Sequence, residues 1–239
     1  PCTKAVIFFL YLIIRNHHSE VLNRFVIIKG VYDFLINESL NNRMGWGGNA
    51  GSIDGFSETD LENSKKGNAF IREFLMEAKP YNILETGTNY GSFSYTCYES
   101  LDDFRLYTCD NHQDNHSARC VGFINDYYDD NKIIYKNIHS LQHLNECRAS
   151  GIEFDLIWLD STHTFEYLYN EMKITAQMKP KFIMVDDFYM LKDMQLAVFE
   201  FLKNHNEYRF YSYSNIRGNV GSIVILQRIE GPSNLNSII

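Results

Sequence analysis

The chain has 239 residues, of which 45% are hydrophobic and 15% aromatic, and its formal net charge is −8. This length and apolar content allow one substantial hydrophobic core and exclude an intrinsically disordered chain. An acidic protein repels phosphate backbones, and the densest basic stretch is only Lys65-Lys66. We therefore expect no nucleic-acid partner.

The cysteines are odd in number, lie far apart along the chain and include no C-x-x-C pair. This spacing argues against both a disulfide framework and a zinc site. It favours a reducing compartment, so we expect a cytoplasmic protein. The five are Cys2, Cys97, Cys109, Cys120 and Cys147.

Residues 1–66 are predicted to form an N-terminal helical extension that ends in a Gly-rich loop. The segment from Ala5 to Ile14 is apolar throughout, but it has about half of the ~20 residues that cross a bilayer. We interpret it as a buried or oligomer-forming helix, with part of a membrane anchor as the alternative; we expect no membrane partner and allow for a homo-oligomer. Residues 20–40 show helical periodicity. Met44 to Ser57 holds five glycines, in a loop that is either a lid or a linker.

From residue 67, short apolar runs alternate with helical stretches, which predicts one domain over 67–230 and a tail at 231–239. Such alternation predicts a mostly parallel, doubly wound α/β sheet with helices on both faces, a Rossmann-like fold. The last two runs are joined only by Asn215 to Gly221 and predict a C-terminal antiparallel hairpin. The expected strands are Asn82–Thr86, Arg105–Asp110, Lys132–Asn137, Phe154–Asp160, Phe182–Asp186, Tyr208–Ser214 and Ser222–Gln227. The expected helices are Ser92–Leu101, Ser117–Tyr128, Leu141–Ala149, Phe165–Met178 and Lys192–Asn204, preceded by one in pieces from Ser57 to Ala78.

A glycine-containing turn follows the first predicted strand, in the pattern E-x-G-x-x-x-G from Glu85 to Gly91. Gly87 allows a sharp turn, and Gly91 lets the next helix begin close to a ligand. A dinucleotide fingerprint would require glycine at position 89, where this chain has Asn89. The turn therefore favours a cationic amino-acid moiety over a pyrophosphate, with Glu85 at the rim facing the ammonium group of a methionine moiety.

The second predicted strand ends in Asp110, 25 residues after Glu85. A carboxylate at this place can accept hydrogen bonds from both hydroxyls of a ribose. Together with the glycine turn, Asp110 predicts a nucleoside-type ligand.

Acidic residues also end the fourth and fifth predicted strands. Asp160 closes the fourth strand, and Asp186-Asp187 close the fifth. Neighbouring parallel strands bring these ends together, and three close carboxylates are costly unless they are protonated or neutralised by a cation. Their oxygens suit a hard ion such as Mg²⁺. The alternative is that Asp186-Asp187 only caps the next helix.

His163 follows Asp160 by three residues in the connecting loop. An imidazole there is a candidate general base for a substrate hydroxyl, whose proton a bound metal ion would make easier to remove. The alternative is a solvated loop histidine.

These motifs together resemble class I S-adenosylmethionine-dependent methyltransferases, over about residues 67 to 228. They are most similar to the metal-dependent O-methyltransferases, of both the catechol type and the macrolide and aminocoumarin sugar type. The segment FDLIWLDSTHTFEYLYNEM is close to the F-D-L-I-F-I-D-G-x-H-x-Y-E pattern of the sugar type.

The resemblance implies the sheet order 3-2-1-4-5-7-6, a metal ion held by Asp160, Asp186 and Asp187, and His163 as the base acting beside Asp160. It implies that the end of the third strand, at His139-Ser140, contacts the adenine. The donor site expected for S-adenosylmethionine comprises Glu85, Gly87, Thr88, Asn89, Gly91, Ser92, Asp110, Asn111, His139, Ser140 and Asp160.

The chain departs from this pattern at two turns. The family usually carries Gly-Ser or Tyr-Ser directly after the second glycine. In this chain Ser92-Phe93-Ser94 follows Gly91, so the serine is displaced by one position. Ser161 stands where the sugar type has glycine in D-G-x-H, which puts the geometry of that turn in question.

The sequence thus predicts an S-adenosylmethionine-dependent O-methyltransferase that uses Mg²⁺ and acts on a hydroxyl of a small molecule, either a sugar or glycosylated metabolite or a phenol. One alternative is a metal-independent methyltransferase whose carboxylates and His163 contact the substrate directly. The other is a non-catalytic nucleoside-binding domain with the same fold.

Overall fold

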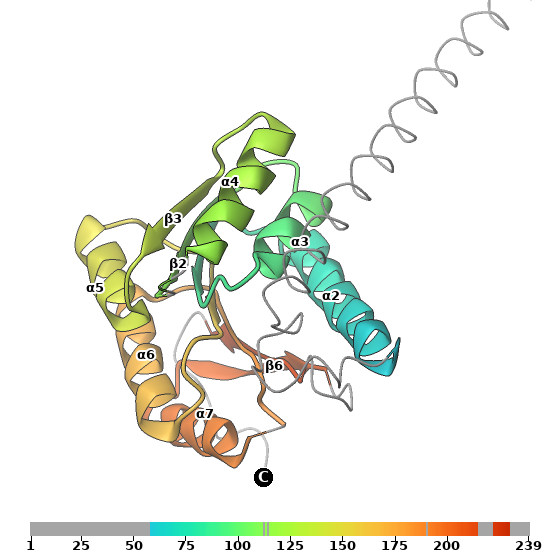
Figure 1. Ribbon diagram of the computed structural model, residues 1–239. Helices are drawn as coiled ribbons and strands as arrows, with labels where there is room; N and C mark the ends of the chain where they lie inside the picture. Colours follow the sequence, from blue (N-terminus) through green and yellow to red (C-terminus); the bar gives the residue numbers. More distant parts are fainter. Residues whose placement is uncertain (1–57, 112, 114, 190, 215–221, 230–239) are drawn as a thin grey trace, which may run out of the picture.

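The computed structural model describes residues 58–111, 113, 115–189, 191–214 and 222–229 (Figure 1). Several predicted features lie outside these residues. They are the apolar segment Ala5 to Ile14, the helix at 20–40, the Gly-rich loop Met44 to Ser57, the hairpin turn Asn215 to Gly221 and the tail at 231–239.

Seven strands form one sheet in the order β3-β2-β1-β4-β5-β7-β6, which confirms the predicted order. The pairs from β3 to β5 are parallel, whereas β7 runs antiparallel to both β5 and β6. The C-terminal antiparallel pair is therefore confirmed as well. The strands are β1 (Asn82–Thr86), β2 (Arg105–Asp110), β3 (Ile133–Asn137), β4 (Leu156–Leu159), β5 (Phe182–Val185), β6 (Tyr208–Tyr213) and β7 (Val224–Arg228).

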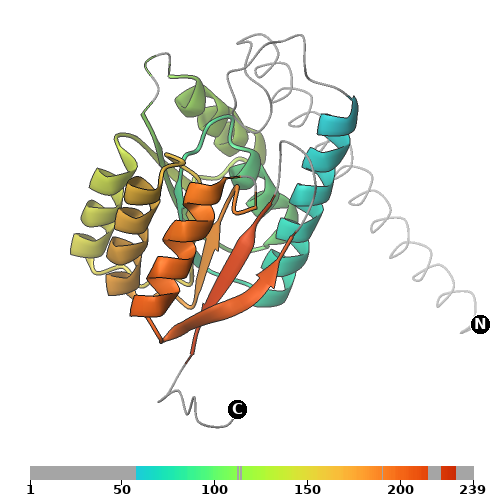
Figure 2. The ribbon, with the colours of Figure 1, turned by 90° about the horizontal axis from the view of Figure 1, so that it is seen from below.

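Helices cover both faces of the sheet (Figures 1 and 2). Helices α2, α3 and α4 pack on one face, and α5, α6 and α7 pack on the other. The helices are α2 (Glu58–Ala78), α3 (Ser92–Ser100), α4 (His116–Tyr128), α5 (Ser140–Ser150), α6 (Phe165–Met178) and α7 (Lys192–Asn204). Within the described residues we find no helix with both the length and the hydropathy of a membrane span.

The central strands are apolar along their whole length because both of their faces are covered. All four residues of β4 and all four of β5 are buried. Successive side chains point to opposite faces, so Ile83 belongs to the core under α2 and α3, and Leu84 belongs to the core under α6 and α7. Continuous apolar runs of this kind are typical of parallel strands buried on both sides.

Two helices end in the same way, at a lysine followed by proline. Lys79 and Lys179 both adopt left-handed backbone conformations, with φ of 46° and 55°. Proline disfavours a helical conformation in the residue before it and cannot continue the helix. Helix α2 is continuous up to this point, so it runs through the predicted boundary between residues 66 and 67, and the division into extension and domain stays a prediction.

Candidate functional site

The glycine turn after β1 lies directly against the end of β4. A Cβ atom added at Gly87 would stand 1.8 Å from the carbonyl oxygen of Asp160, and Gly87 has a φ of 89°. The Asp160 amide donates to the carbonyl oxygen of Thr86 at 3.0 Å. Only glycine fits this position, and the contact fixes the predicted donor turn beside the predicted acceptor residues.

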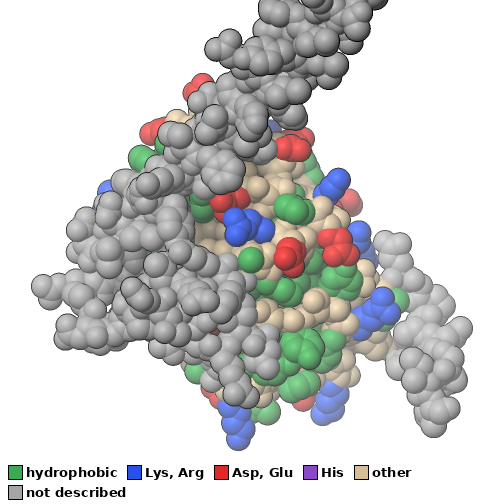
Figure 3. Space-filling view, turned by 90° about the vertical axis from the view of Figure 1, so that its right-hand side faces the viewer, with side chains coloured by type: hydrophobic (Ala, Val, Ile, Leu, Met, Phe, Trp, Pro, Cys, Tyr) green, Lys and Arg blue, Asp and Glu red, His purple; other side chains and the backbone are tan. Residues whose placement is uncertain are grey.

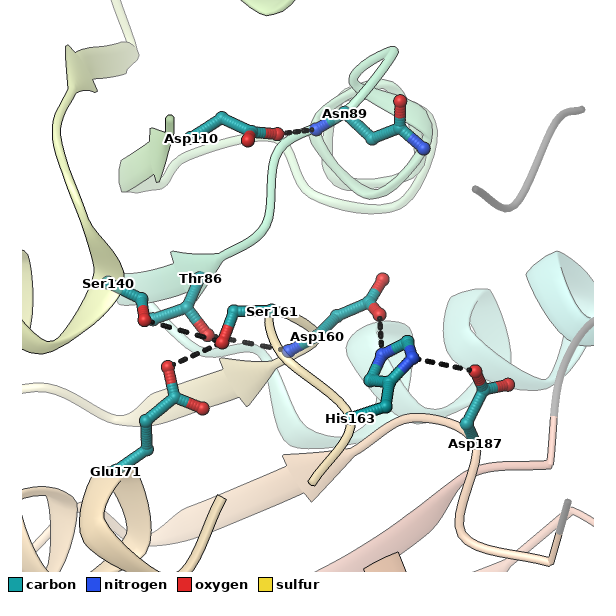
Figure 4. A network of polar contacts seen from close by, with 9 residues as sticks. All are labelled: Thr86, Asn89, Asp110, Ser140, Asp160, Ser161, His163, Glu171 and Asp187. Atoms are coloured by element: carbon teal, nitrogen blue, oxygen red, sulfur yellow. Dashed lines mark hydrogen bonds and ion pairs between the residues drawn. The ribbon is translucent and has the colours of Figure 1, made fainter. Parts of the chain in front are cut away.

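Asp110 holds the glycine turn in place from the end of β2 (Figure 4). One oxygen of its carboxylate accepts from the Asn89 amide at 2.6 Å, and the other accepts from the Asn111 amide at 2.7 Å. Asn89 needs this support because its φ is 45°, in the left-handed region where non-glycine residues are uncommon. The structure thus brings the two donor motifs together, and the ribose contact of Asp110 stays a prediction.

Glu85 lies beneath the turn rather than at its rim. Its side chain is 1% exposed, and the hydroxyl groups of Thr108 and Ser94 donate to its carboxylate. Burial raises its pKa to about 8. Glu85 is two residues from Ile83 on the same strand, so it faces the α3 layer, where helix α3 covers it.

Three further members of the predicted donor site lie in the glycine turn or at the start of α3. The hydroxyl of Thr88 is buried and pairs with the Thr108 hydroxyl at 2.6 Å, so it points into the domain. Gly91 caps α3 with a φ of 73°, and Ser92 is the first residue of that helix.

Two polar side chains meet where β2 and the β3–α5 loop end. The Asn111 amide nitrogen lies 3.0 Å from Nε2 of His139, and both side chains are exposed. Ser140, the next residue, begins α5, and its hydroxyl forms a hydrogen bond with the Tyr167 hydroxyl at 3.0 Å. The region assigned to the adenine therefore forms one contiguous edge with Asp110.

The imidazole of His163 lies between two carboxylates (Figure 4). Its Nε2 atom is 3.2 Å from Asp160, and its Nδ1 atom is 3.3 Å from Asp187. Burial is the main cause that raises the pKa of Asp160, and the charge of Asp187 adds to it. Burial also raises the pKa of Asp187, whereas the nearby His163 lowers it.

Asp186 completes the set of acids at this edge. Burial, followed by the charge of Asp160, raises the pKa of its carboxyl well above the ordinary value. Its Oδ1 atom is buried and has no hydrogen-bond partner. An unsatisfied buried carboxylate oxygen costs free energy, and binding a cation or a proton would remove this cost.

The three acids fit a hard divalent cation in their chemistry but not in their present arrangement. Among the described residues, no three His, Cys, Asp or Glu side chains form a group that could hold a metal ion. His163 occupies the space between Asp160 and Asp187. A metal ion bridging these two carboxylates would require the imidazole to move aside.

Sequence reasoning missed a buried carboxylate below the β4–α6 loop. Glu171 of α6 is 1% exposed and accepts from the Ser161 hydroxyl at 2.7 Å. Burial raises its pKa to about 7, while hydrogen bonds from neighbouring hydroxyl groups act in the opposite direction. The available signal was its spacing, since Glu171 stands three residues after Leu168 and beside Met172 on the inner face of the helix.

No protein-family model matches the chain, and no curated protein matches it in sequence. Solved structures with a similar fold include methyltransferases. An O-methyltransferase from Bacillus cereus in complex with S-adenosylhomocysteine (SAH) aligns with a TM-score of 0.57 at 14% identity, over 85% of this chain and 91% of that one. An SAH-bound methyltransferase from Podospora anserina aligns with a TM-score of 0.53 at 14% identity, over 73% of this chain and 89% of that one.

A ribosomal protein L11 methylase from Lactobacillus delbrueckii subsp. bulgaricus also aligns, with a TM-score of 0.50 at 14% identity, over 69% of this chain and 78% of that one. These likenesses establish that the chain has the class I methyltransferase fold. The neighbours include one named for a ribosomal protein, so the fold leaves the acceptor open.

Proposed function

We propose that this protein is an S-adenosylmethionine-dependent methyltransferase that methylates a hydroxyl group of a small molecule. The observation that carries the proposal is the contact of Gly87 with Asp160, because it joins the donor turn to the loop of His163. The SAH-bound structural neighbours support the choice of donor. The expected acceptor is a sugar or glycosylated metabolite, or a phenol.

His163 is the proposed general base. Its imidazole takes the proton of the acceptor hydroxyl while the oxygen forms a bond to the methyl carbon and the carbon–sulfur bond of the donor breaks, which leaves SAH. Asp160 and Asp187 lie on either side of the ring, so they stabilise the imidazolium that forms and orient the ring.

We further propose that Mg²⁺ takes part, held by Asp160, Asp186 and Asp187. A Mg²⁺ ion held by these residues would supply a positive charge that lowers the pKa of an acceptor hydroxyl. The orphan Oδ1 atom of Asp186 supports this proposal. The position of His163 between Asp160 and Asp187 favours the second candidate, a metal-independent methyltransferase in which the imidazolium balances the two carboxylates.

The setting of the reaction also stays a proposal. The four cysteines among the described residues are all buried thiols, which supports a reducing compartment such as the cytoplasm. Lys and Arg side chains are interspersed with acidic and apolar ones on the face shown in Figure 3, which supports a small-molecule acceptor rather than nucleic acid.

Calorimetric titration tests the proposal. The purified protein is titrated with S-adenosylmethionine and with SAH, once with Mg²⁺ and once after chelation. Binding in the micromolar range supports the donor site, and methyl transfer to a panel of sugars and phenols then identifies the acceptor. Absence of binding in both conditions would leave the fold and remove the proposed activity. Binding without turnover on any acceptor would favour a non-catalytic nucleoside-binding domain.

A further inference from the structure

Four buried or half-buried polar side chains form a hydrogen-bonded chain that connects the two ends of the candidate site. The Ser161 hydroxyl donates to Glu171 at 2.7 Å, and the Ser140 hydroxyl donates to the Ser161 oxygen at 3.3 Å. The Ser140 hydroxyl oxygen also lies 3.0 Å from the hydroxyl of Tyr167, which is able to donate to it and stands one helical turn before Glu171. Figure 4 shows Glu171 below Ser161, on the side away from His163.

Each end of this chain belongs to a different part of the site. Ser140 opens α5 directly after His139, at the edge predicted to bind the adenine. Ser161 directly follows Asp160 and stands two residues before His163. The buried carboxylate of Glu171 therefore anchors the donor side and the acceptor side at one point.

A second contact fixes the same peptide from above. The Asp160 amide donates to the Thr86 carbonyl, and the Asp160 carbonyl oxygen closely approaches Gly87. With Glu171 holding Ser161 from below, the segment that carries His163 is clamped where it leaves the sheet. Glycine at position 161 could not make the lower contact, so this clamp depends on the serine that distinguishes the chain from the D-G-x-H pattern.

We infer that Glu171 is a positioning residue: through Ser161 it holds the β4–α6 loop with His163 in place, and through Ser140 it couples that loop to occupation of the donor site. The coupling to the donor rests on the proposed function. A side chain that supports a reacting group by hydrogen bonds must itself be fixed, and a buried carboxylate that accepts from several hydroxyl groups is suited to this.

Amide hydrogen exchange of residues 160–164 measures the clamp directly, because exchange reports local opening. The variants are Ser161→Ala, Glu171→Leu and Glu171→Gln, with Glu166→Leu as the matched control on the same helix, where the side chain is exposed. Loss of one buried hydrogen bond is expected to accelerate exchange roughly tenfold in Ser161→Ala and Glu171→Leu. Glu171→Gln keeps an acceptor for the serine, so its rate should stay within about twofold of the unmodified protein.

A second arm adds SAH. In the unmodified protein SAH should slow exchange at residues 160–164, and this protection should disappear in Ser161→Ala. If no SAH binding occurs, the proposed function fails, while the ligand-free comparison still tests the clamp. Unchanged exchange in both Ser161→Ala and Glu171→Leu, or equal acceleration in Glu171→Gln and Glu171→Leu, would overturn the positioning role. The Ser161→Ala result decides the matter if Glu171→Leu does not fold.

Discussion

Replacing the buried Glu85 by glutamine should change how the stability of the protein depends on pH. Burial raises the pKa of this carboxyl from 4.5 to about 8. The folded state therefore keeps a proton that the unfolded chain releases as the pH rises above 4.5. The contribution of Glu85 to the free energy of unfolding is fully present below pH 4.5 and is lost as the pH rises through 8. Each pH unit in this window costs about 1.4 kcal/mol of unfolding free energy.

Glu85→Gln removes this contribution because an amide does not titrate, while its oxygen can still accept from Thr108 and Ser94. Urea unfolding at pH 6, 7 and 8 measures the effect, with exposed Glu73→Gln as the control. Between pH 6 and pH 8 the unmodified protein should lose roughly 2 kcal/mol of unfolding free energy that Glu85→Gln does not lose. A difference that stays constant across this range, as expected for the control, would refute the assignment of a buried, protonated Glu85.

Four further perturbations test the site. Gly87→Ala should lower the free energy of unfolding by roughly 3 kcal/mol or more, because the added Cβ atom would overlap the Asp160 carbonyl. The control is Gly151→Ala, at a position that also has a positive φ but has open space around it; it should lower the free energy of unfolding by only about 1 kcal/mol. Equal losses would mean that the backbone conformation alone sets the effect. His163→Ala should lower turnover by about a hundredfold or more with little change in SAH affinity by calorimetry, and a large loss of affinity would contradict its role as base. Asp110→Ala should weaken SAH binding at least about tenfold, since it removes the predicted ribose acceptor and the support of the glycine turn; unchanged affinity would contradict that role. Chelation should abolish turnover of the unmodified protein, and added Mg²⁺ should restore it. In Asp186→Asn, added Mg²⁺ should not restore turnover. Full turnover of the unmodified protein after chelation would select the metal-independent reaction.

The order of strands and helices could be predicted because each buried strand is a short apolar run and each helix has a polar face. The observed strand boundaries lie within two residues of those expected. The end residues Asp110 and Asp160 were found for the same reason, because acids that interrupt apolar runs mark the carboxyl edge of a parallel sheet.

Side-chain depth could not be predicted from the same pattern. Glu85 lies near the end of an apolar strand and Asp110 lies at the end of the next, but the side chain of Glu85 points under α3 and not toward the edge. Helix α3 comes to lie over that face only because Gly91 allows the chain to turn there. Glu171 was missed for a related reason, since a glutamate on a helix is exposed in most proteins, and its partner Ser161 comes from a loop whose path the sequence does not specify.

The acidic side chains at the carboxyl edge of the sheet support the proposal of a cationic donor. Five acidic residues lie close enough to Asp160 to interact with it electrostatically: Glu85, Asp110, Glu171, Asp186 and Asp187. Burial raises the pKa of Glu85, Asp160, Glu171, Asp186 and Asp187. A buried carboxyl group with a raised pKa is neutral until a nearby positive charge favours its ionisation, so this edge can balance a sulfonium, an ammonium group or a divalent cation, and it offers a phosphate no group of opposite charge. Asp160 and Asp187 contact the two ring nitrogens of His163 at the same edge, and this contact supports the proposed transfer of the acceptor proton.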